Sequence, residues 1–134
     1  MAARTESYID TSAFIAFCDR SDSHHVKYLR LFSDPPPIVT SALVVAEGHG
    51  WFLRRYDQSR AIQFLRLINE MTPLRVLPFG TEDLKRASEL LNKFSDQAVT
   101  LADLHGLVLM RERKIRECWS TDRHMSLTGA RLVT

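Results

Sequence analysis

The segment YIDTSAFIAF, residues 8–17, holds the signal that decides the fold. A short apolar strand, expected over 7–10, ends at Asp10. Two small hydroxyl residues follow, and apolar residues then recur at helical spacing. A helix capped by Thr11 or Ser12 should therefore begin directly after the acid. A buried strand that ends at a carboxylate and turns at once into a helix is typical of the site-bearing edge of a parallel α/β sheet.

Three further acids stand in comparable places along the chain. Glu47 lies in TSALVVAEGH (40–49), Asp103 in VTLADLHGLV (99–108) and Asp122 in WSTDRHM (119–125). Each has mainly apolar or hydroxyl neighbours, whereas a solvated face would mix acids with Lys and Arg. Taken singly, Asp103 could belong to a capping box and Asp122 could be a cap or turn residue, whereas Glu47 in so apolar a segment would need a partner. Gathered together, four carboxylates would form an all-oxygen pocket suited to Mg²⁺ or Mn²⁺. Such a pocket is typical of metal-dependent phosphodiesterases.

Short apolar segments alternate with amphipathic ones along the rest of the chain. Strands are expected over 38–39, 74–77, 115–119 and 131–133, of which the one at 74–77 should be buried, and helices over about 42–56, 59–70, 81–91 and 101–113. A further helix, capped by Asp22 or Ser23, should bury Val26, Tyr28, Leu29 and Phe32. This order predicts a three-layer α/β/α sandwich with a mainly parallel central sheet. Because sites in such sheets form at the carboxyl ends of the strands, the four acids are expected at one edge.

Composition places the chain among soluble single-domain proteins, with one domain expected over 1–134. Eighteen Lys and Arg against 16 acids give a net charge of +2, which permits nucleic acid as a partner without requiring it. Cys18 and Cys118 form no CxxC pair, so buried thiols in a reducing cytosol are expected. With no secretory signal or long apolar run in the sequence, we expect a cytoplasmic location and no membrane partner.

Five segments together resemble the PIN-domain ribonucleases, in particular the toxin half of VapBC-type toxin–antitoxin pairs. They are YIDTSAFIAF, SDSHHVKY, VTSALVVAEG, DQAVTLADLHGLVLM and WSTDRHMSLTGARLV, and they span nearly the whole chain. Two positions depart from the pattern of that family. Ser120 stands where Thr is common and Met125 where an aromatic residue is common. Serine keeps the hydroxyl and methionine keeps an apolar side chain, so we expect both changes to be tolerated.

The resemblance implies a Mg²⁺- or Mn²⁺-dependent endoribonuclease that acts as the toxin of a type II toxin–antitoxin system. Asp10, Glu47, Asp103 and Asp122 would be the catalytic metal ligands. Hydrogen-bonding groups that orient the carboxylates or water would be Thr11, Ser12, Thr40, Asp96, Thr100 and Ser120. The partners implied are an RNA substrate, a cognate antitoxin protein and a second copy of the chain in a homodimer. Exposed apolar residues around Trp51–Tyr56 and Phe64–Ile68 would suit the antitoxin, although core packing also explains them.

Positive groups beside an acidic pocket would be needed to hold RNA. The candidates are Arg123, His124, Arg20 and Lys27, together with Arg54, Arg55 and Arg113, and ordinary solvated charges remain the alternative for each. Two other functions stay open: a PIN nuclease of RNA processing without an antitoxin, and a PIN-like scaffold that binds RNA or protein without cleaving. A Rossmann-like small-molecule binder is disfavoured because the sequence has no GxGxxG or GxxxxGK[ST] loop.

Overall fold

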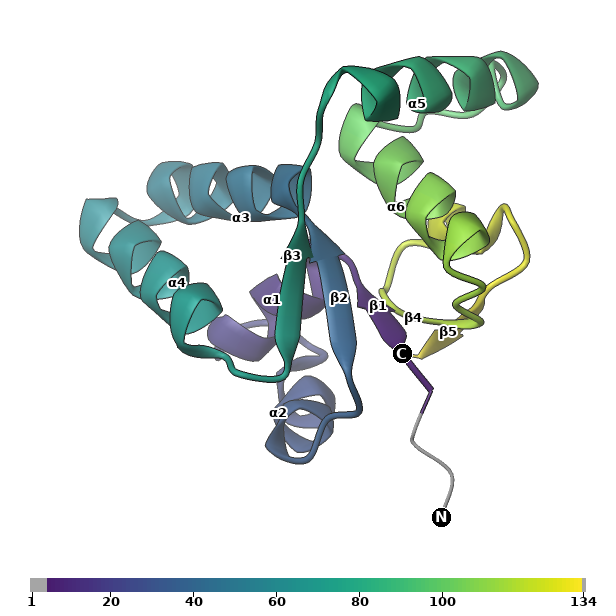
Figure 1. The fold of residues 1–134 in the computed structure, drawn as a ribbon. Coiled ribbons are helices and arrows are strands. Elements are labelled where there is room, and N and C mark those ends of the chain that lie inside the picture. Colours follow the sequence, from purple (N-terminus) through teal and green to yellow (C-terminus); the bar gives the residue numbers. More distant parts are fainter. Residues whose placement is uncertain (1–4, 134) are drawn as a thin grey trace.

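The computed structural model describes residues 5–133 and contains a five-stranded sheet in the order β3-β2-β1-β4-β5, shown in Figure 1. All four neighbouring pairs of strands run parallel, and Tyr8 lies opposite both Val39 and Cys118. The expected mainly parallel sheet is therefore confirmed. The strands are β1 (Ser7–Ile9), β2 (Ile38–Ser41), β3 (Leu74–Leu77), β4 (Glu117–Trp119) and β5 (Arg131–Val133).

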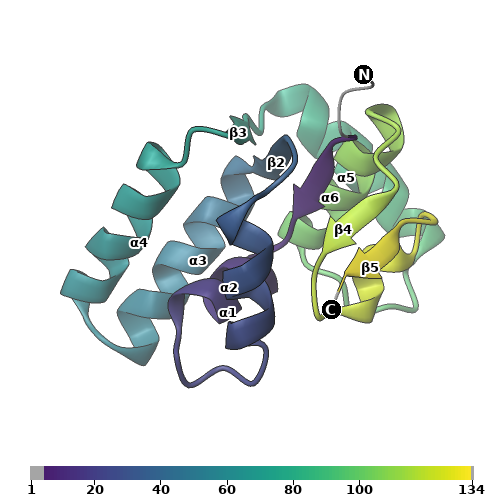
Figure 2. The same cartoon turned by 90° about the horizontal axis from the view of Figure 1, so that it is seen from below.

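Helices cover both faces of this sheet and complete the three-layer sandwich. Figure 2 shows α1 and α2 on one face, with α5 and α6 on the other. A hairpin of α3 and α4 packs against α1, where the rings of Phe64 and Phe14 lie 6.1 Å apart. The helices are α1 (Thr11–Cys18), α2 (His25–Ser33), α3 (Ala42–Arg55), α4 (Gln58–Glu70), α5 (Thr81–Lys93) and α6 (Leu101–Glu112), followed by a 3₁₀ turn, η1 (Arg123–Ser126). Within residues 5–133 no helix is long and apolar enough to cross a membrane.

Strand residues supply core side chains to both faces because successive side chains point in opposite directions. Tyr8 packs toward α6, where it lies close to Gly106. Trp119 points the other way and meets Phe32 of α2 with ring centroids 5.0 Å apart. All three large side chains are almost fully buried. The central strands β1 and β4 therefore hold the two helical layers together, and their carboxyl ends are fixed in position.

Two expectations about burial are wrong, and both errors have a topological cause. The strand at 74–77 was expected to be buried, but Arg75 and Val76 are exposed because β3 is an edge strand of the sheet. In α2, Tyr28 and Phe32 are buried as expected, whereas Val26 is 61% and Leu29 48% exposed. α2 covers the sheet with one narrow face, so the apolar residues that flank this face are left largely exposed to solvent.

Gly106 lets α6 approach β1 closely enough to bring the two layers into contact. A Cβ atom at this position would lie 2.7 Å from the hydroxyl oxygen of Tyr8 and 2.8 Å from Cε of Met125. Both neighbours are fully buried and cannot move into solvent. We expect Gly106→Ala to lower the free energy of unfolding by about 1–3 kcal/mol, the usual cost of overpacking. Urea unfolding would measure the loss of stability. An unchanged unfolding midpoint would show that α6 can move away from β1 at no cost and that the close approach is not needed.

Candidate active site

The four acids singled out in the sequence line one pocket of about 260 Å³, although they come from four separate segments. Asp10 follows β1, and Asp122 follows the adjacent strand β4. Glu47 lies in the second turn of α3 and Asp103 in the first turn of α6. Parallel strands put their carboxyl ends at one edge of the sheet, and helices that start at that edge add the other two acids. Asp10 and Asp103 are buried, while Glu47 and Asp122 are half-buried.

Asp10 is the most enclosed of the four, with 3% of its surface exposed. Its Oδ2 accepts hydrogen bonds from the Ser120 hydroxyl at 2.8 Å and the Ser12 hydroxyl at 3.4 Å. Burial raises the pKa of this carboxyl to about 6; the Ser120 hydrogen bond opposes the increase, and the negative charge of Asp103 adds to it. The site therefore disfavours a carboxylate at Asp10 unless a cation is present.

Asp103 has two functions at the start of α6. Its Oδ2 accepts the Thr100 amide at 3.0 Å, while its own amide donates to the Thr100 hydroxyl at 3.1 Å. This reciprocal capping box holds the carboxylate in one orientation against the helix. The cap engages one carboxylate oxygen, and Asp103 also lines the acidic pocket. The capping interpretation and the ligand interpretation of this residue are therefore compatible.

A hydroxyl group orients Glu47, and the backbone amide and imidazole of His124 orient Asp122. The Thr11 hydroxyl donates to Oε1 of Glu47 at 2.5 Å, which links α1 to α3. Asp10 rather than Thr11 occupies the N-cap of α1, so the Thr11 side chain is available for this contact. Asp122 Oδ1 accepts the His124 amide at 3.0 Å and lies 2.9 Å from Nδ1 of that residue. One potential ligand atom each from Asp103, Asp122 and His124 lies within 4.8 Å of the others.

The chemistry of this donor set fits a hard divalent cation. Carboxylate oxygens from four residues suit Mg²⁺ or Mn²⁺, and an imidazole at the margin is compatible with Mn²⁺. Burial raises the pKa of Asp10 and the negative charge of Asp103 adds to the increase, so a bound cation would favour the carboxylate form of Asp10. The assignment of Asp10, Glu47, Asp103 and Asp122 as metal ligands stays a prediction.

Most of the hydroxyl residues expected to orient the acids contact them. Thr11, Ser12, Thr100 and Ser120 each hydrogen-bond an acid of the pocket. Thr40 does not, because its buried hydroxyl donates to the backbone carbonyl of Ile9 at 2.6 Å.

Asp96 is likewise not placed at the pocket. It lies in the exposed turn that follows α5 and is not among the residues that line the acidic pocket.

Few of the basic residues suggested for RNA lie at the pocket. Arg54 lines it, and His124 and its neighbour Arg123 follow Asp122 directly. The structure does not bring the other candidates there. Arg20 lines a different pocket, Lys27 is exposed on α2, Arg55 lies over the Tyr56 ring, and Arg113 pairs with Glu6.

A buried histidine was not anticipated as part of the framework of the site. His105 is fully buried; its Nδ1 lies 2.6 Å from the hydroxyl of Ser41, and its Nε2 lies 3.4 Å from Asp83. Burial lowers the pKa of His105, although Asp83 opposes the shift. The histidine thus links α6, which carries Asp103, to the start of α3, which carries Glu47. The sequence gives no local signal for this contact, because residues 41 and 105 meet only in the folded chain.

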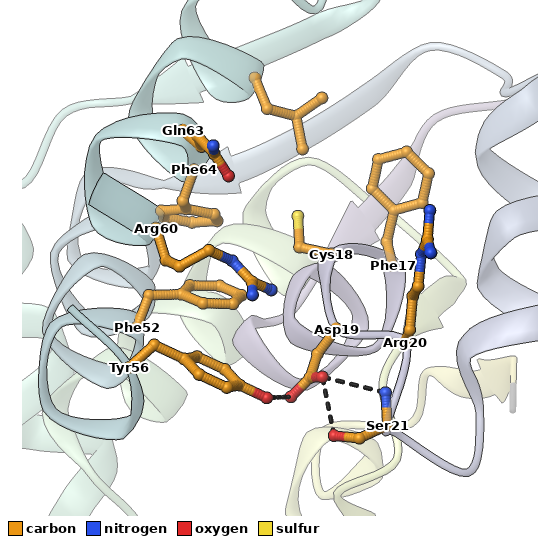
Figure 3. Close-up of a pocket in the computed structure, with 11 residues that line it drawn as sticks. Phe17, Cys18, Asp19, Arg20, Ser21, Phe52, Tyr56, Arg60, Gln63 and Phe64 are labelled. Carbon is orange, nitrogen blue, oxygen red and sulfur yellow. Dashed lines mark hydrogen bonds between the residues drawn. The ribbon is translucent and has the colours of Figure 1, made fainter. Parts of the chain in front are cut away.

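A second, larger pocket of about 760 Å³ lies where α1, α3 and α4 meet, and it shares no lining residue with the acidic pocket. Figure 3 shows the rings of Phe17, Phe52 and Phe64 along its walls. Asp19 accepts hydrogen bonds from the Tyr56 hydroxyl at 2.9 Å and the Ser21 hydroxyl at 2.7 Å. The guanidinium of Arg60 lies 4.5 Å from the centroid of the Tyr56 ring. The pocket therefore combines apolar walls with a rigid polar margin.

A parallel α/β sandwich with an acidic pocket at the carboxyl ends of its strands defines the class of this protein. The family profile of the PIN domain matches residues 7–130. The chain belongs to the PIN-domain family, and the resemblance found in the sequence is confirmed at this level.

Solved structures share the fold over nearly the whole chain. The Mycobacterium tuberculosis toxin VapC20, described as cleaving the sarcin–ricin loop, superposes with a TM-score of 0.85 at 24% identity, covering 93% of this chain and 96% of that one. VapBC2 of Rickettsia felis, bound to promoter DNA, gives 0.65 at 12% identity, covering 96% and 98%. A toxin–antitoxin complex of Klebsiella pneumoniae gives 0.63 at 15% identity, covering 96% of each chain. The search of curated proteins found no match.

Proposed function

We propose that the chain is a metal-dependent endoribonuclease and the toxin component of a toxin–antitoxin pair. The observation that carries the proposal is the convergence of Asp10, Glu47, Asp103 and Asp122 on one pocket. An acidic cluster of purely structural origin would pair its carboxylates with Lys or Arg. Here hydroxyl and amide donors contact all four acids without neutralising them, and the imidazole of His124 lies 2.9 Å from Asp122. Membership of the PIN-domain family supports the nuclease part of the proposal.

The four carboxylates would hold Mg²⁺ or Mn²⁺. When bound, such an ion neutralises a scissile phosphate and lowers the pKa of a coordinated water molecule. The chain's own residues orient the acids: Ser120 and Ser12 hold Asp10, Thr11 holds Glu47, and the Thr100 capping box holds Asp103. Hydrogen bonds of this kind pre-organise a site, because the carboxylates do not have to rearrange when the substrate enters.

Cationic groups at the margin of the pocket would meet the RNA. Arg54 lines the pocket, and His124 lies beside Asp122. A guanidinium can bind two oxygens of one phosphate, which would fix the backbone next to the carboxylates. Arg123 follows Asp122 directly and is exposed, so it would contact the strand as it leaves the pocket.

The experiment that tests the nuclease is cleavage of total RNA by the purified chain. We expect discrete fragments with defined ends in Mg²⁺ or Mn²⁺, and none when EDTA is present. Sequencing the fragment ends would give the RNA and the cleaved bond. A folded chain that binds Mn²⁺ yet leaves every RNA intact would contradict the proposal and favour a non-cleaving scaffold.

The toxin part of the proposal implies an antitoxin, and a homodimer as the assembled unit. One of the similar structures is described as a toxin–antitoxin complex, and another as VapBC2 bound to a fragment of its promoter DNA. The pocket of Figure 3 would suit a partner helix, because each of its apolar walls carries a cation: Arg60 lies beside Phe52 and Phe64, and Arg20 beside Phe17. An amphipathic segment that carries acidic residues fits this chemistry.

Co-expression with the product of the adjacent open reading frame would test this partner. We expect Leu67→Asp, inside the pocket, to abolish the complex, and Leu91→Asp, exposed on α5, to preserve it. Light scattering of the chain alone and of the complex would give the oligomeric state. Equal loss of binding in both variants would show that the partner binds elsewhere.

A further inference from the structure

We propose that a basic surface at the C-terminal end of α6 anchors the phosphate backbone of an RNA whose scissile bond lies in the acidic pocket. The position of the scissile bond in the acidic pocket rests on the proposed function, whereas the binding of RNA to the basic surface does not. We call the surface the basic ridge. It consists of Arg111, Arg113, Lys114, Arg116 and Arg131.

The basic ridge separates two hollows on the face of the molecule remote from the acids. Lys114, Ile115 and Arg116 line both hollows, which have volumes of about 480 and 320 Å³. Arg113 and Arg131 add to the first hollow, and Arg111 adds to the second. The ridge comes from the end of α6 and the starts of β4 and β5, so it lies at the opposite edge of the sheet from Asp10 and Asp122.

Within residues 5–133, two cations of the ridge are in ion pairs and three are not. Arg113 makes a two-point contact with Glu6 at 3.0 and 2.7 Å, and Arg131 pairs with Glu117 at 2.5 Å. These two pairs link residues that line the first hollow. Arg111, Lys114 and Arg116 are exposed, and no ion pair involves them among residues 5–133.

Five cations and two acids thus line the two hollows, in a chain whose net charge is only +2. The excess positive charge of the protein is concentrated here, and clustered cations of this kind attract a polyanion.

Lys114 occupies an unusual backbone conformation at the crest of the ridge. Its φ is +57°, and the following amide of Ile115 returns to the carbonyl of Met110 at 2.8 Å. This is the position after a helix end at which glycine is the common residue. A side chain in this conformation costs about 1 kcal/mol relative to glycine, so the lysine is not explained by local stability. It places a cation between the two hollows.

The length of α6 defines the RNA that can reach both sites. The helix has 12 residues and therefore spans about 18 Å at 1.5 Å per residue. Stacked nucleotides rise about 3.4 Å each along a strand, so about five of them bridge the acidic pocket and the ridge. A substrate shorter than this would use the acidic pocket alone. The ridge therefore favours long or folded RNA over short oligonucleotides.

The test compares two triple variants with equal net charge. Arg111→Gln/Lys114→Gln/Arg116→Gln removes the unpaired cations of the ridge, and Arg30→Gln/Arg66→Gln/Arg75→Gln removes three exposed cations elsewhere. Both are made in the Asp103→Asn protein and measured in EDTA, so that binding is separated from cleavage. The probes are a fluorescein-labelled 40-nucleotide RNA hairpin and a four-nucleotide RNA, followed by anisotropy between 0.05 and 0.3 M salt.

We expect the ridge variant to bind the hairpin about 10- to 100-fold more weakly at 0.1 M salt. A plot of the logarithm of the association constant against the logarithm of the salt concentration has a negative slope. The magnitude of this slope should decrease by about two to three, close to one for each lost phosphate contact. The control triple should change affinity less than about threefold, and the four-nucleotide RNA should not distinguish the variants. Equal weakening in both triples would overturn the proposal, since net charge alone would explain it. Failure of the parent protein to bind the hairpin would overturn it as well.

The two proposals can fail separately in this design. If the ridge variant alone loses hairpin binding while the native chain cleaves no RNA, the anchoring site stands and the nuclease falls. If metal-dependent cleavage is found and both triples bind the hairpin equally, the nuclease stands and the anchor falls.

Discussion

Replacing Asp103 with asparagine will remove RNA cleavage and leave the fold intact. Asparagine can still accept the Thr100 amide through its carbonyl oxygen, so the capping box of α6 is largely kept. The change removes one negative charge from the acidic pocket. We expect the rate to fall roughly 10²–10³-fold, the loss found when one pre-organised electrostatic group is deleted. Mn²⁺ affinity, measured by titration calorimetry, should fall at least about tenfold.

A matched variant separates this effect from the chemistry of helix caps. Asp57 caps α4 by accepting the Arg60 amide at 2.9 Å, and it lies outside the acidic pocket. Asp57→Asn makes the same chemical change at a helix start and should leave both cleavage and Mn²⁺ affinity within about twofold of wild type. If Asp103→Asn retains full cleavage, the carboxylate is only a cap and the four-acid site is wrong.

Replacing Asp10 with asparagine will make the metal-free protein more stable and abolish its activity. The pKa of Asp10 is raised from 3.8 to about 6, so ionising it costs about 3 kcal/mol more in the folded chain than in the unfolded one. Asparagine avoids this cost and still accepts the Ser120 hydrogen bond. The new amide needs a partner, which offsets part of the gain. We expect about 1–3 kcal/mol of added stability at pH 7 in EDTA, measured by urea unfolding.

The pH dependence follows from the sign of this shift. Between about pH 4 and 6 the folded chain holds the Asp10 proton more tightly than the unfolded chain. The contribution of Asp10 to stability therefore falls as pH rises through this range and is fully lost above about pH 6. The stability of wild type and Asp10→Asn should converge near pH 4 and differ most above pH 6. Saturating Mn²⁺ should reverse the order at pH 7, because it stabilises only the chain that binds it well.

Asp19 provides a control of opposite sign. Burial raises the pKa of Asp19, but hydrogen bonds from Ser21 and Tyr56 outweigh burial, and the net shift is downward. Asp19→Asn should therefore lower the free energy of unfolding at pH 7. It is the same substitution of a buried Asp as Asp10→Asn, but the expected effect has the opposite sign. If Asp10→Asn proves destabilising in EDTA at every pH, the acidic pocket is not electrostatically strained, and the argument that it needs a cation fails.

The two largest predictions express one property of the acidic pocket. The Asp10 carboxylate, which the proposed reaction needs, reduces the stability of the metal-free fold, so replacing it should improve stability while it destroys activity. Such an opposition is typical of functional sites, where groups are held for their chemistry and other parts of the fold compensate. A purely structural Asp10 would show the reverse.

The sequence by itself determined the alternation of strands and helices and marked the four acids. Asp10 and Asp103 were found because each directly follows a local signal, the end of an apolar strand or a Thr-led helix start. Such signals depend on a few adjacent residues, and those residues are present in any conformation of the chain. The resemblance to PIN-domain proteins likewise rested on short segments and was confirmed by the match over residues 7–130.

Only the tertiary structure decided which of the marked residues meet. Ser120 reaches Asp10 across 110 positions and Ser41 reaches His105 across 64, while Thr40, Asp96 and Arg113 prove to lie in other surroundings. β3 is exposed because it lies at the edge of the sheet. Val26 and Leu29 are exposed because α2 contacts the sheet along a narrow face only. These outcomes depend on strand order and helix packing, which local propensity does not encode. The basic ridge has the same origin, because α6, β4 and β5 bring its cations together only when the sheet forms.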